Sequence, residues 1–251
     1  MVLFARVPAK PVTDSLRLLE ADIVECARCP RLRAHCEEVA RVKRRAYRHQ
    51  QYWGKPVPPF GDPAARVLIV GLAPGAHGAN RTGRMFTGDK SGDFLYGVLH
   101  KTGFATQAES HWRDDGLELR DAWITASARC APPDNKPATE EIRACRTFLV
   151  RELGLLRNVR VVVALGRIAF DNYLATVRGQ GVEVKASELP FEHGRVHELG
   201  VGLPKLISSY HPSQQNTSTG RLTEPMLRAV FERARGLAAS GGLSRPWRAG
   251  A

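Results

Sequence analysis

Hydrophobic and polar positions follow two patterns along this chain, and these patterns predict strands and helices in turn. Short apolar runs rich in β-branched residues predict buried strands at residues 67–71, 122–126, 159–165 and 205–210. Apolar residues at helical spacing predict helices at residues 13–26, 30–45, 91–102, 138–156, 166–176 and 222–238. Strands that alternate with helices favour a mainly parallel sheet with helices on both faces.

The segments between these elements are richer in proline, glycine and polar residues. Residues 47–62 predict a proline-rich connection, and residues 182–201 predict a hairpin or a loop. The chain has no internal repeat and no convincing interdomain linker, so we expect one domain over residues 1–251. Its ends, residues 1–12 and 240–251, have the composition of flexible tails.

The first predicted strand runs into a glycine-rich stretch, residues 71–89, which reads GLAPGAHGANRTGRMFTGD. Glycines let the backbone approach a ligand closely, and α/β proteins bind ligands at the carboxyl ends of parallel strands. The stretch contains neither GxxxxGK[ST] nor GxGxxG, so it is not a nucleotide-phosphate loop. Its proline, amide, imidazole and aromatic groups suit a flat heterocycle better. An ordinary surface loop is the alternative, although loops of this length are usually functional.

The composition is that of a globular protein. The chain has 251 residues, of which 43% are apolar and 25% charged, so a substantial core is expected. No apolar run approaches the ~20 residues needed to span a bilayer. The opening MVLFARVPAKPV is too short and too interrupted by proline for a signal peptide. We therefore expect a cytoplasmic protein without a membrane segment.

The formal net charge of +12 points first to a polyanionic partner, although a basic proteome without nucleic-acid function explains it equally well. The densest basic cluster comprises Arg41, Lys43, Arg44, Arg45 and Arg48. A solvated helix face explains this cluster somewhat better than direct DNA contact does. Charge alone therefore leaves the partner open.

The five cysteines include a C-x2-C pair, Cys26 and Cys29, and a C-x14-C pair, Cys130 and Cys145. We do not expect disulfides between them in a cytosolic chain. Four thiolates suit structural zinc or a [4Fe–4S] cluster, and the wide second pair mildly favours the cluster. Cys36 is interpreted as a buried or half-buried thiol outside the ligand set. Scattered core cysteines are the alternative for all five.

Four motifs now stand together: GLAPGAHGANRTGRMFTGD, the C-x2-C pair before it, RCAPPDNKP with its following cysteine, and SYHPSQQNTSTGRLT. In this combination the chain resembles the iron–sulfur uracil-DNA glycosylases, specifically their family 5 branch, over roughly residues 20–239. The resemblance implies an α/β/α sandwich with a mainly parallel four-stranded central sheet. It also implies that Cys26, Cys29, Cys130 and Cys145 hold a structural [4Fe–4S] cluster.

The resemblance further implies roles for individual residues. The base pocket would be lined, partly through backbone groups, by Gly71, Leu72, Ala73, Pro74 and His77. Phe86 would stack on the extruded base, and His211 would lie against the base carbonyl. The loop after the HPS motif would enter the DNA minor groove and fill the vacated space with Ser213, Gln214, Gln215, Asn216 and Arg221.

Several residues compete for the role of positioning the attacking water. Most branches of the superfamily carry a polar residue where this chain has Ala73, and the absence of that residue is itself typical of family 5. The resemblance implies an asparagine for this role, and Asn135 in APPDN is the best match. Asn80 and His77 are the alternatives, and the carboxylate of Asp89 lies in the same stretch as both.

Residues 125–127 bear on the choice of base. Related branches carry an asparagine here that reads uracil, whereas this chain has Ala126 and Ser127. We therefore expect the substrate to be DNA that contains uracil or another deaminated base, such as hypoxanthine, xanthine or a damaged cytosine. No lysine stands out as a Schiff-base nucleophile, so the expected reaction is a hydrolysis that leaves an abasic site. A monomer suffices for this chemistry.

Each assignment has a plainer alternative. Phe86 could belong to the core, His211 could be a structural histidine, and Asn135 could be a turn residue. For the whole chain, the competing interpretations are an iron–sulfur redox or electron-transfer protein and a zinc-stapled nucleic-acid binder without catalysis. The first leaves the glycine-rich stretch and the HPS motif unexplained, and the second predicts zinc in place of iron and sulfide.

Overall fold

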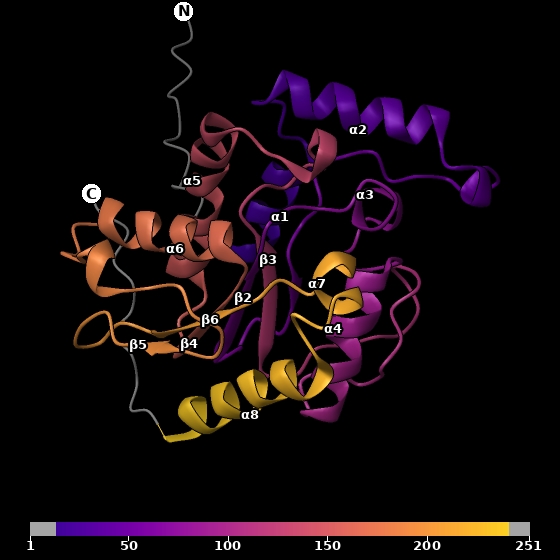
Figure 1. The fold of residues 1–251 in the computed structure, drawn as a ribbon. Helices are drawn as coiled ribbons and strands as arrows, with labels where there is room; N and C mark the ends of the chain where they lie inside the picture. The colour runs from indigo at the N-terminus through magenta and orange to yellow at the C-terminus, as the bar shows by residue number, and fades with distance from the viewer. Residues whose placement is uncertain (1–13, 241–251) are drawn as a thin grey trace, which may run out of the picture.

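A computed structural model describes residues 14–240 of the chain, so the two predicted tails lie outside the described residues apart from residue 240. A single sheet forms the centre of the molecule (Figure 1). Its strands are β1 (Phe60–Gly61), β2 (Val67–Gly71), β3 (Ala122–Ala126), β4 (Val161–Leu165), β5 (Val196–His197) and β6 (Lys205–Ser209).

The strand order is β1-β3-β2-β4-β6-β5, with four parallel strands inside and an antiparallel strand at each edge. The four inner strands are the four that the apolar runs predicted. The sheet was expected to have four strands and has six, because β1 and β5 are too short to give a periodic pattern. β5 lies in the segment for which a hairpin or a loop was predicted.

Eight α-helices and three short 3-10 turns surround the sheet within the described residues. The helices are α1 (Leu16–Val24), α2 (Pro30–Val42), α3 (Ala79–Thr82), α4 (Lys90–Lys101), α5 (Thr139–Leu155), α6 (Arg167–Gly179), α7 (Gln214–Ser218) and α8 (Glu224–Ser240). The 3-10 turns are η1 (Arg45–Tyr47), η2 (Pro133–Asn135) and η3 (Ala186–Glu188). The long helices confirm the predicted ones, whereas α3 and α7 were not predicted.

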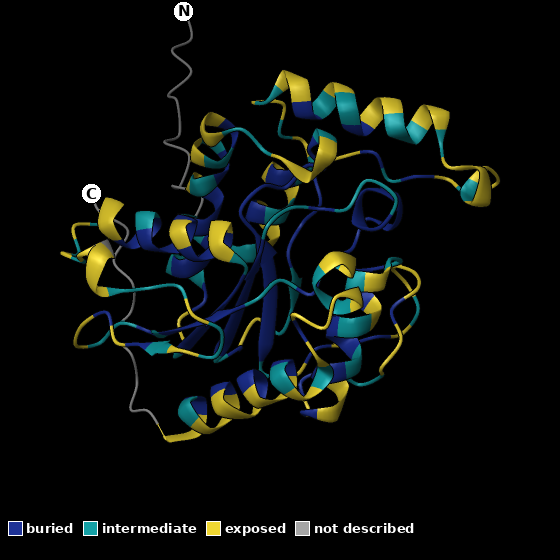
Figure 2. Cartoon of the chain, viewed as in Figure 1, coloured by how far each residue is buried: buried dark blue, intermediate teal, exposed yellow. Residues whose placement is uncertain are grey.

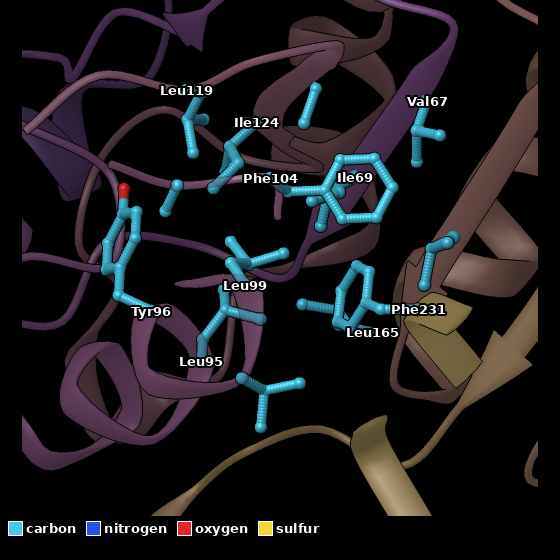
Figure 3. Close-up of a cluster of buried hydrophobic side chains, with 14 of the residues drawn as sticks. Val67, Ile69, Leu95, Tyr96, Leu99, Phe104, Leu119, Ile124, Leu165 and Phe231 are labelled. Atoms are coloured by element: carbon cyan, nitrogen blue, oxygen red, sulfur yellow. The ribbon is translucent and has the colours of Figure 1, made fainter. Parts of the chain in front are cut away.

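The helices form two layers, one on each face of the sheet. Helices α4 and α8 pack on the face that carries Val67 and Ile69, where Leu99 and Phe231 meet the strand residues (Figure 3). Helices α5 and α6 pack on the opposite face, against Leu68 and the other alternate positions. Strands buried on both faces read as unbroken apolar runs, which is why the sequence located them well. The fold is the predicted α/β/α sandwich.

Two helix boundaries differ from the predictions. Asp89, not Ser91, caps α4: its backbone is extended and its carboxylate accepts a hydrogen bond from the Gly92 N–H at 3.0 Å. Helix α2 ends at Val42 rather than residue 45, because Lys43 has a φ of 58° and breaks the helical path. The basic residues after Lys43 therefore do not belong to a helix face.

The N-terminal helices lie outside the sandwich. Helix α1 packs on α5 through Leu19, Ile23 and Phe148. Helix α2 crosses the molecule above the sheet and buries only Leu32 and Cys36, as its mostly exposed and half-buried surface shows (Figure 2). We call residues 15–42, which comprise α1, α2 and the turn between them, the N-terminal cap. No helix among residues 14–240 is long and apolar enough to cross a bilayer.

Candidate active site

A pocket of about 830 Å³ opens at the edge where the carboxyl ends of the parallel strands lie. Residues from the loops after β2, β3 and β6 line it, together with two residues from the segment around η1. This location is where open α/β sheets bind ligands, and the volume is typical of a small-molecule site.

The loop after β2, residues 72–88, is held rigidly by two buried arginines. Arg81 is 5% exposed and donates to the carbonyls of His77 and Gly88, both at 2.7 Å. Arg84 is 3% exposed and binds Asp115 through two nitrogens, at 2.8 and 2.7 Å. Charge-assisted bonds of this kind are strong, so the loop has a fixed shape before any ligand arrives.

The Arg84 pairing also appears in the ionisation of its partner. Burial would raise the pKa of Asp115. The Arg84 guanidinium and the backbone N–H groups of Trp112, Leu117 and His111 outweigh burial and hold that pKa well below its usual range. Asp115 therefore stays ionised, and the buried charge of Arg84 stays neutralised.

Four of the six predicted base-binding residues line the pocket: Leu72, Ala73, His77 and Phe86. Gly71 and Pro74 are buried beside it and do not line it. Gly71 makes room for the aromatic ring, because a Cβ at this position would lie 2.8 Å from the Phe86 ring. Phe86 itself adopts a φ of 52°, a left-handed conformation that is rare for a bulky residue and that directs its ring into the site.

Phe86 and His211 lie next to one another and both line the pocket. Their ring centroids are 5.9 Å apart and the planes are tilted by 32°. Gly166, which has a φ of 95° at the end of β4, packs against the His211 side chain. Burial lowers the pKa of His211 to about 4, so the imidazole is neutral at physiological pH. A neutral ring can donate one hydrogen bond without carrying a full charge.

The backbone of His211 is fixed from two sides. The Asn216 side chain donates to the His211 carbonyl at 2.9 Å. The preceding Tyr210 N–H donates to His193 Nδ1 at 3.1 Å, and the His193 ring stacks on Tyr210. Ser213 caps α7 by accepting from the Asn216 N–H. Asn216 thus acts on the site through His211, and it does not line the pocket.

The predicted minor-groove loop is partly helical, because α7 occupies much of it. Ser213, Gln214 and Gln215 line the pocket mouth. Arg221 is exposed outside the pocket, with its guanidinium 4.8 Å from the Tyr210 ring centroid. Of the five residues predicted to enter the minor groove, Ser213, Gln214 and Gln215 line the pocket, and Asn216 and Arg221 do not.

The structure separates the two asparagines proposed for the water. Asn135 is exposed, lines the pocket beside Asp134 and follows that residue in a left-handed turn, with φ values of 57° and 52°. Asn80 is fully buried and does not line the pocket. Its side-chain amide donates weakly to the carbonyls of Cys36 and Ala76, at 3.3 and 3.4 Å.

His77 and Asp89 line the pocket from its loop side. His77 Nδ1 lies 3.0 Å from the Tyr52 hydroxyl, and burial together with the nearby Arg44 charge lowers the pKa of His77. Burial raises the pKa of Asp89. One Asp89 oxygen accepts the hydrogen bond that caps α4. The other oxygen would lie only 1.9 Å from a Cβ atom at Gly78. The Asp89 side chain therefore holds the loop against the helix.

Residues 125–127 do not reach the pocket. The Thr125 hydroxyl donates to Glu152 at 2.8 Å, and the Ser127 hydroxyl donates to the Gly71 carbonyl at 3.2 Å. Both side chains are buried and serve the fold.

The sequence interpretation missed five polar residues that line the pocket: Arg44, Tyr47, Lys90, Ser91 and Asp134. Arg44 had been assigned to a helix face, which the early end of α2 rules out. Lys90 follows the glycine-rich stretch directly, and Asp134 directly precedes Asn135. Only the proximity of Lys90 and Asp134 in sequence to recognised motifs could have signalled these two residues.

The four predicted ligand cysteines lie on the N-terminal cap and on the sandwich. Cys26 and Cys29 lie between α1 and α2, Cys130 follows β3, and Cys145 lies within α5. All are free thiols. Burial raises the pKa of Cys29 to about 11, and the charges of Cys145, Cys130 and Cys26 raise it further, so the four sulfurs lie near one another. Cys36 is fully buried, as predicted, and its thiol contacts Cys130.

The surroundings of these thiols fit an anionic group. The Arg33 side chain donates to the Cys130 sulfur, and the backbone N–H of Arg129 donates to the Cys145 sulfur. Such donors stabilise thiolates that hold a metal cluster. Residues 14–240 contain no group of three or more His, Cys, Asp or Glu side chains placed to hold a metal ion.

An α/β sandwich with a preformed pocket at its parallel edge, an aromatic ring and a neutral imidazole defines a class of enzymes that act on a flat, uncharged heterocycle. A sequence model of the uracil DNA glycosylase superfamily matches residues 58–235. The chain belongs to this superfamily and, within it, to the type-5 branch.

Three relatives illustrate the relationship. A type-5 uracil-DNA glycosylase of Thermus thermophilus is 52% identical over 86% of this chain and 95% of its own length. A type-5 uracil-DNA glycosylase of Mycobacterium bovis is 49% identical over 88% of this chain and 81% of its own length. A type-5 uracil-DNA glycosylase of Pyrobaculum aerophilum is 46% identical over 84% of this chain and 88% of its own length.

Proposed function

We propose that this protein excises uracil from DNA by hydrolysing the N-glycosyl bond and leaves an abasic site for repair. The observation that carries this proposal is the pair of Phe86 and His211, whose rings lie side by side and line one pocket that is large enough for one base. A base within a duplex cannot reach such a pocket, so the nucleotide must be flipped out of the stack. Type-5 relatives across most of the chain support the same reaction.

The pocket supplies the groups that this reaction needs. Cleavage leaves positive charge on the sugar and negative charge on the departing base. Phe86 offers a face on which the base can stack, and the neutral His211 ring can donate to the developing anion at its carbonyl oxygen. Preorganised donors of this kind are each worth roughly 3 kcal/mol in the transition state. Uracil leaves readily as an anion, so no strong acid is required.

Asn135 is the proposed water-positioning residue. It lines the pocket and its side chain is exposed, whereas Asn80 is buried in the loop and bonded to backbone carbonyls. A neutral amide orients water without acting as a strong base. Asn135→Ala should lower the single-turnover excision rate while the melting temperature stays unchanged. The matched Asn80→Ala should instead lower the melting temperature. A larger loss of rate per folded molecule in Asn80→Ala would reverse the assignment.

We further propose that excision extends to other deaminated bases, which include hypoxanthine, xanthine and damaged cytosines. The Thr125 and Ser127 side chains form hydrogen bonds within the protein, and residues 125–127 include no asparagine that could bind the edge of uracil. Base selection then depends on pocket shape and backbone groups. Competition of uracil, hypoxanthine and xanthine substrates in one assay measures this range, and excision confined to uracil would contradict it.

The four cysteines are proposed to hold a structural [4Fe–4S] cluster. Their shared location and the N–H groups that face Cys130 and Cys145 support this assignment. The cluster would cross-link the N-terminal cap to the sandwich, at the far end of α2 from the pocket-lining residue Arg44. We propose that the protein acts as a monomer in the cytoplasm.

The test of the function is a single-turnover assay on a labelled duplex with one U:G pair, followed by alkali, with an undamaged duplex as control. Cleavage at the uracil only after alkali is the expected result, because no lysine serves as a Schiff-base nucleophile. Strand cleavage without alkali would indicate a lyase. An intact duplex, with the iron and sulfide content confirmed in the same sample, would refute uracil excision and favour the redox interpretation.

A further inference from the structure

Two basic residues that line the pocket have no side-chain partner among the described residues. Arg44 and Lys90 both line the pocket and are exposed. Neither side chain forms an ion pair or a hydrogen bond with any residue between 14 and 240. By contrast, nearby Arg41 binds Glu38, and Lys101 at the other end of α4 binds Glu224. Arg44 and Lys90 thus combine an unpaired charge with a place in the pocket lining, whereas Arg41 and Lys101 have neither.

The position of Lys90 does not serve the helix that it begins. Lys90 is the first residue of α4. The N-terminus of a helix carries partial positive charge, so a cation there is unfavourable by a few tenths of a kcal/mol to about 1 kcal/mol, and an acidic residue would suit the position better. A residue that does not stabilise its own helix and faces the site is suited to binding an anion from outside.

Arg44 is held at the rim by the contacts of the segment around η1. Helix α2 stops at Val42, and the chain turns through Lys43 into η1. The Tyr47 ring of η1 lies 4.1 Å from the guanidinium of Arg81, the buried arginine that also binds the pocket loop. Arg81 further donates to Gln50 at 2.7 Å. The segment that carries Arg44 is thereby fastened to the pocket loop, at the end of α2 in Figure 1.

We propose that Arg44 and Lys90 form a phosphate clamp: each binds one backbone phosphate of the strand whose base enters the pocket. The inference deepens the proposed function, on which it rests. Two unpaired cations from separate elements that line the same pocket are suited to bind phosphates of the strand that enters it. Tyr47 and Arg81 position the clamp and are not themselves contacts to phosphate.

The clamp predicts a change in the salt dependence of DNA binding. Each phosphate that a protein neutralises adds about 0.9 to the slope of log affinity against log salt. Arg44→Gln and Lys90→Gln should therefore each reduce the slope by about 0.9, and the double variant by about twice that. Between 50 and 200 mM salt, each single variant should lose about 3.5-fold less affinity than the wild type does.

The measurement is fluorescence anisotropy on a duplex that carries a stable abasic analogue, in a salt series. Arg41→Gln and Lys101→Gln are the matched controls, because each removes the same charge from an ion pair away from the pocket. Wild-type slopes in the controls and reduced slopes in the clamp variants are expected. Equal reductions in all four would show a diffuse positive field, and unchanged slopes in Arg44→Gln and Lys90→Gln would equally overturn the clamp.

A second readout separates the clamp from a structural role. Lys90→Gln removes a cation from a helix N-terminus, so its melting temperature should equal or exceed that of the wild type while its DNA binding weakens. A lower melting temperature with an unchanged slope would make Lys90 a structural residue and refute the clamp. Because the assay measures binding, it decides on the clamp even if the wild type fails to excise uracil.

Discussion

The pocket loop, residues 72–88, and the N-terminal cap are held to the same sandwich in opposite ways. The loop is fixed by Arg81 and Arg84, whose guanidinium groups are buried. The cap is tied to the body by a small apolar cluster and by partly exposed ion pairs, such as that of Arg31 and Glu141, in which the Arg31 side chain is 49% exposed. Buried pairs lose heavily when broken, whereas exposed pairs contribute little.

This difference bears on the proposed cluster. The pocket loop contains none of the four proposed ligand cysteines. The cap has only a small core around Leu19 and Ile23, so its attachment benefits from a cross-link. Cys26 and Cys29 contribute from the cap, and Cys130 and Cys145 from the body. The active site is thus preorganised by packing, and the cap is proposed to depend on its metal.

Breaking the loop should have the largest effect. Arg84→Gln removes a buried guanidinium from a pair in which the Arg84 and Asp115 side chains are 3% and 11% exposed, which should lower the free energy of unfolding by about 3–5 kcal/mol. Arg31→Gln, the matched change in the cap, removes a guanidinium that is 49% exposed, and Glu141 keeps its hydrogen bond from the Ala138 N–H, so the effect should be much smaller. Urea unfolding of both variants measures the contrast. Equal losses would show that the cap, too, depends on its ion pairs.

Removing the proposed cluster should weaken the cap next. Cys145→Ser should abolish bound iron and sulfide and destabilise the protein by about 3 kcal/mol. At about 2–4 °C per kcal/mol for a protein of this size, the melting temperature should fall by about 10 °C. Limited proteolysis should then cut first within residues 15–42. Cys36→Ala, a change to a thiol outside the ligand set, is the control and should retain iron. A Cys145→Ser protein with full iron content would contradict the ligand assignment.

Within the rigid loop region, chemistry and stability should separate at His211. His211→Ala should lower excision by about 100-fold or more through loss of a transition-state donor, while DNA binding is largely kept. The single-turnover rate at saturating enzyme gives the effect. An unchanged rate would remove His211 from the mechanism.

The smallest expected effect is on pH dependence. Burial lowers the pKa of His211 from 6.5 to about 4, so the unfolded chain binds a proton here at a higher pH than the folded one. This residue therefore contributes stability at neutral pH that declines as pH falls from about 6.5 towards 4. His211→Gln should show a flatter stability profile in that window. An NMR titration midpoint near 6.5 would contradict the buried, neutral ring.

The amino-acid sequence by itself determined the framework. The strands 67–71 and 122–126 were located to the residue, because strands buried on both faces are continuous apolar runs with β-branched residues. The glycine-rich stretch and the HPS motif marked the segments that form the pocket, since both follow predicted parallel strands. The order of these motifs also sufficed to place the chain in its family.

Tertiary structure alone decided which side chains reach the site. Asn80 and Asn135 are equivalent on paper, yet long-range packing buries the first beneath α2, and a left-handed turn places the second in the pocket. Arg44 left the predicted helix because of a single positive φ at Lys43. Local sequence encodes periodicity and turn preference. Burial and ion pairing depend instead on residues that are distant in the chain, as in the ion pair between Arg84 and Asp115. The pocket therefore became visible only once the chain was folded.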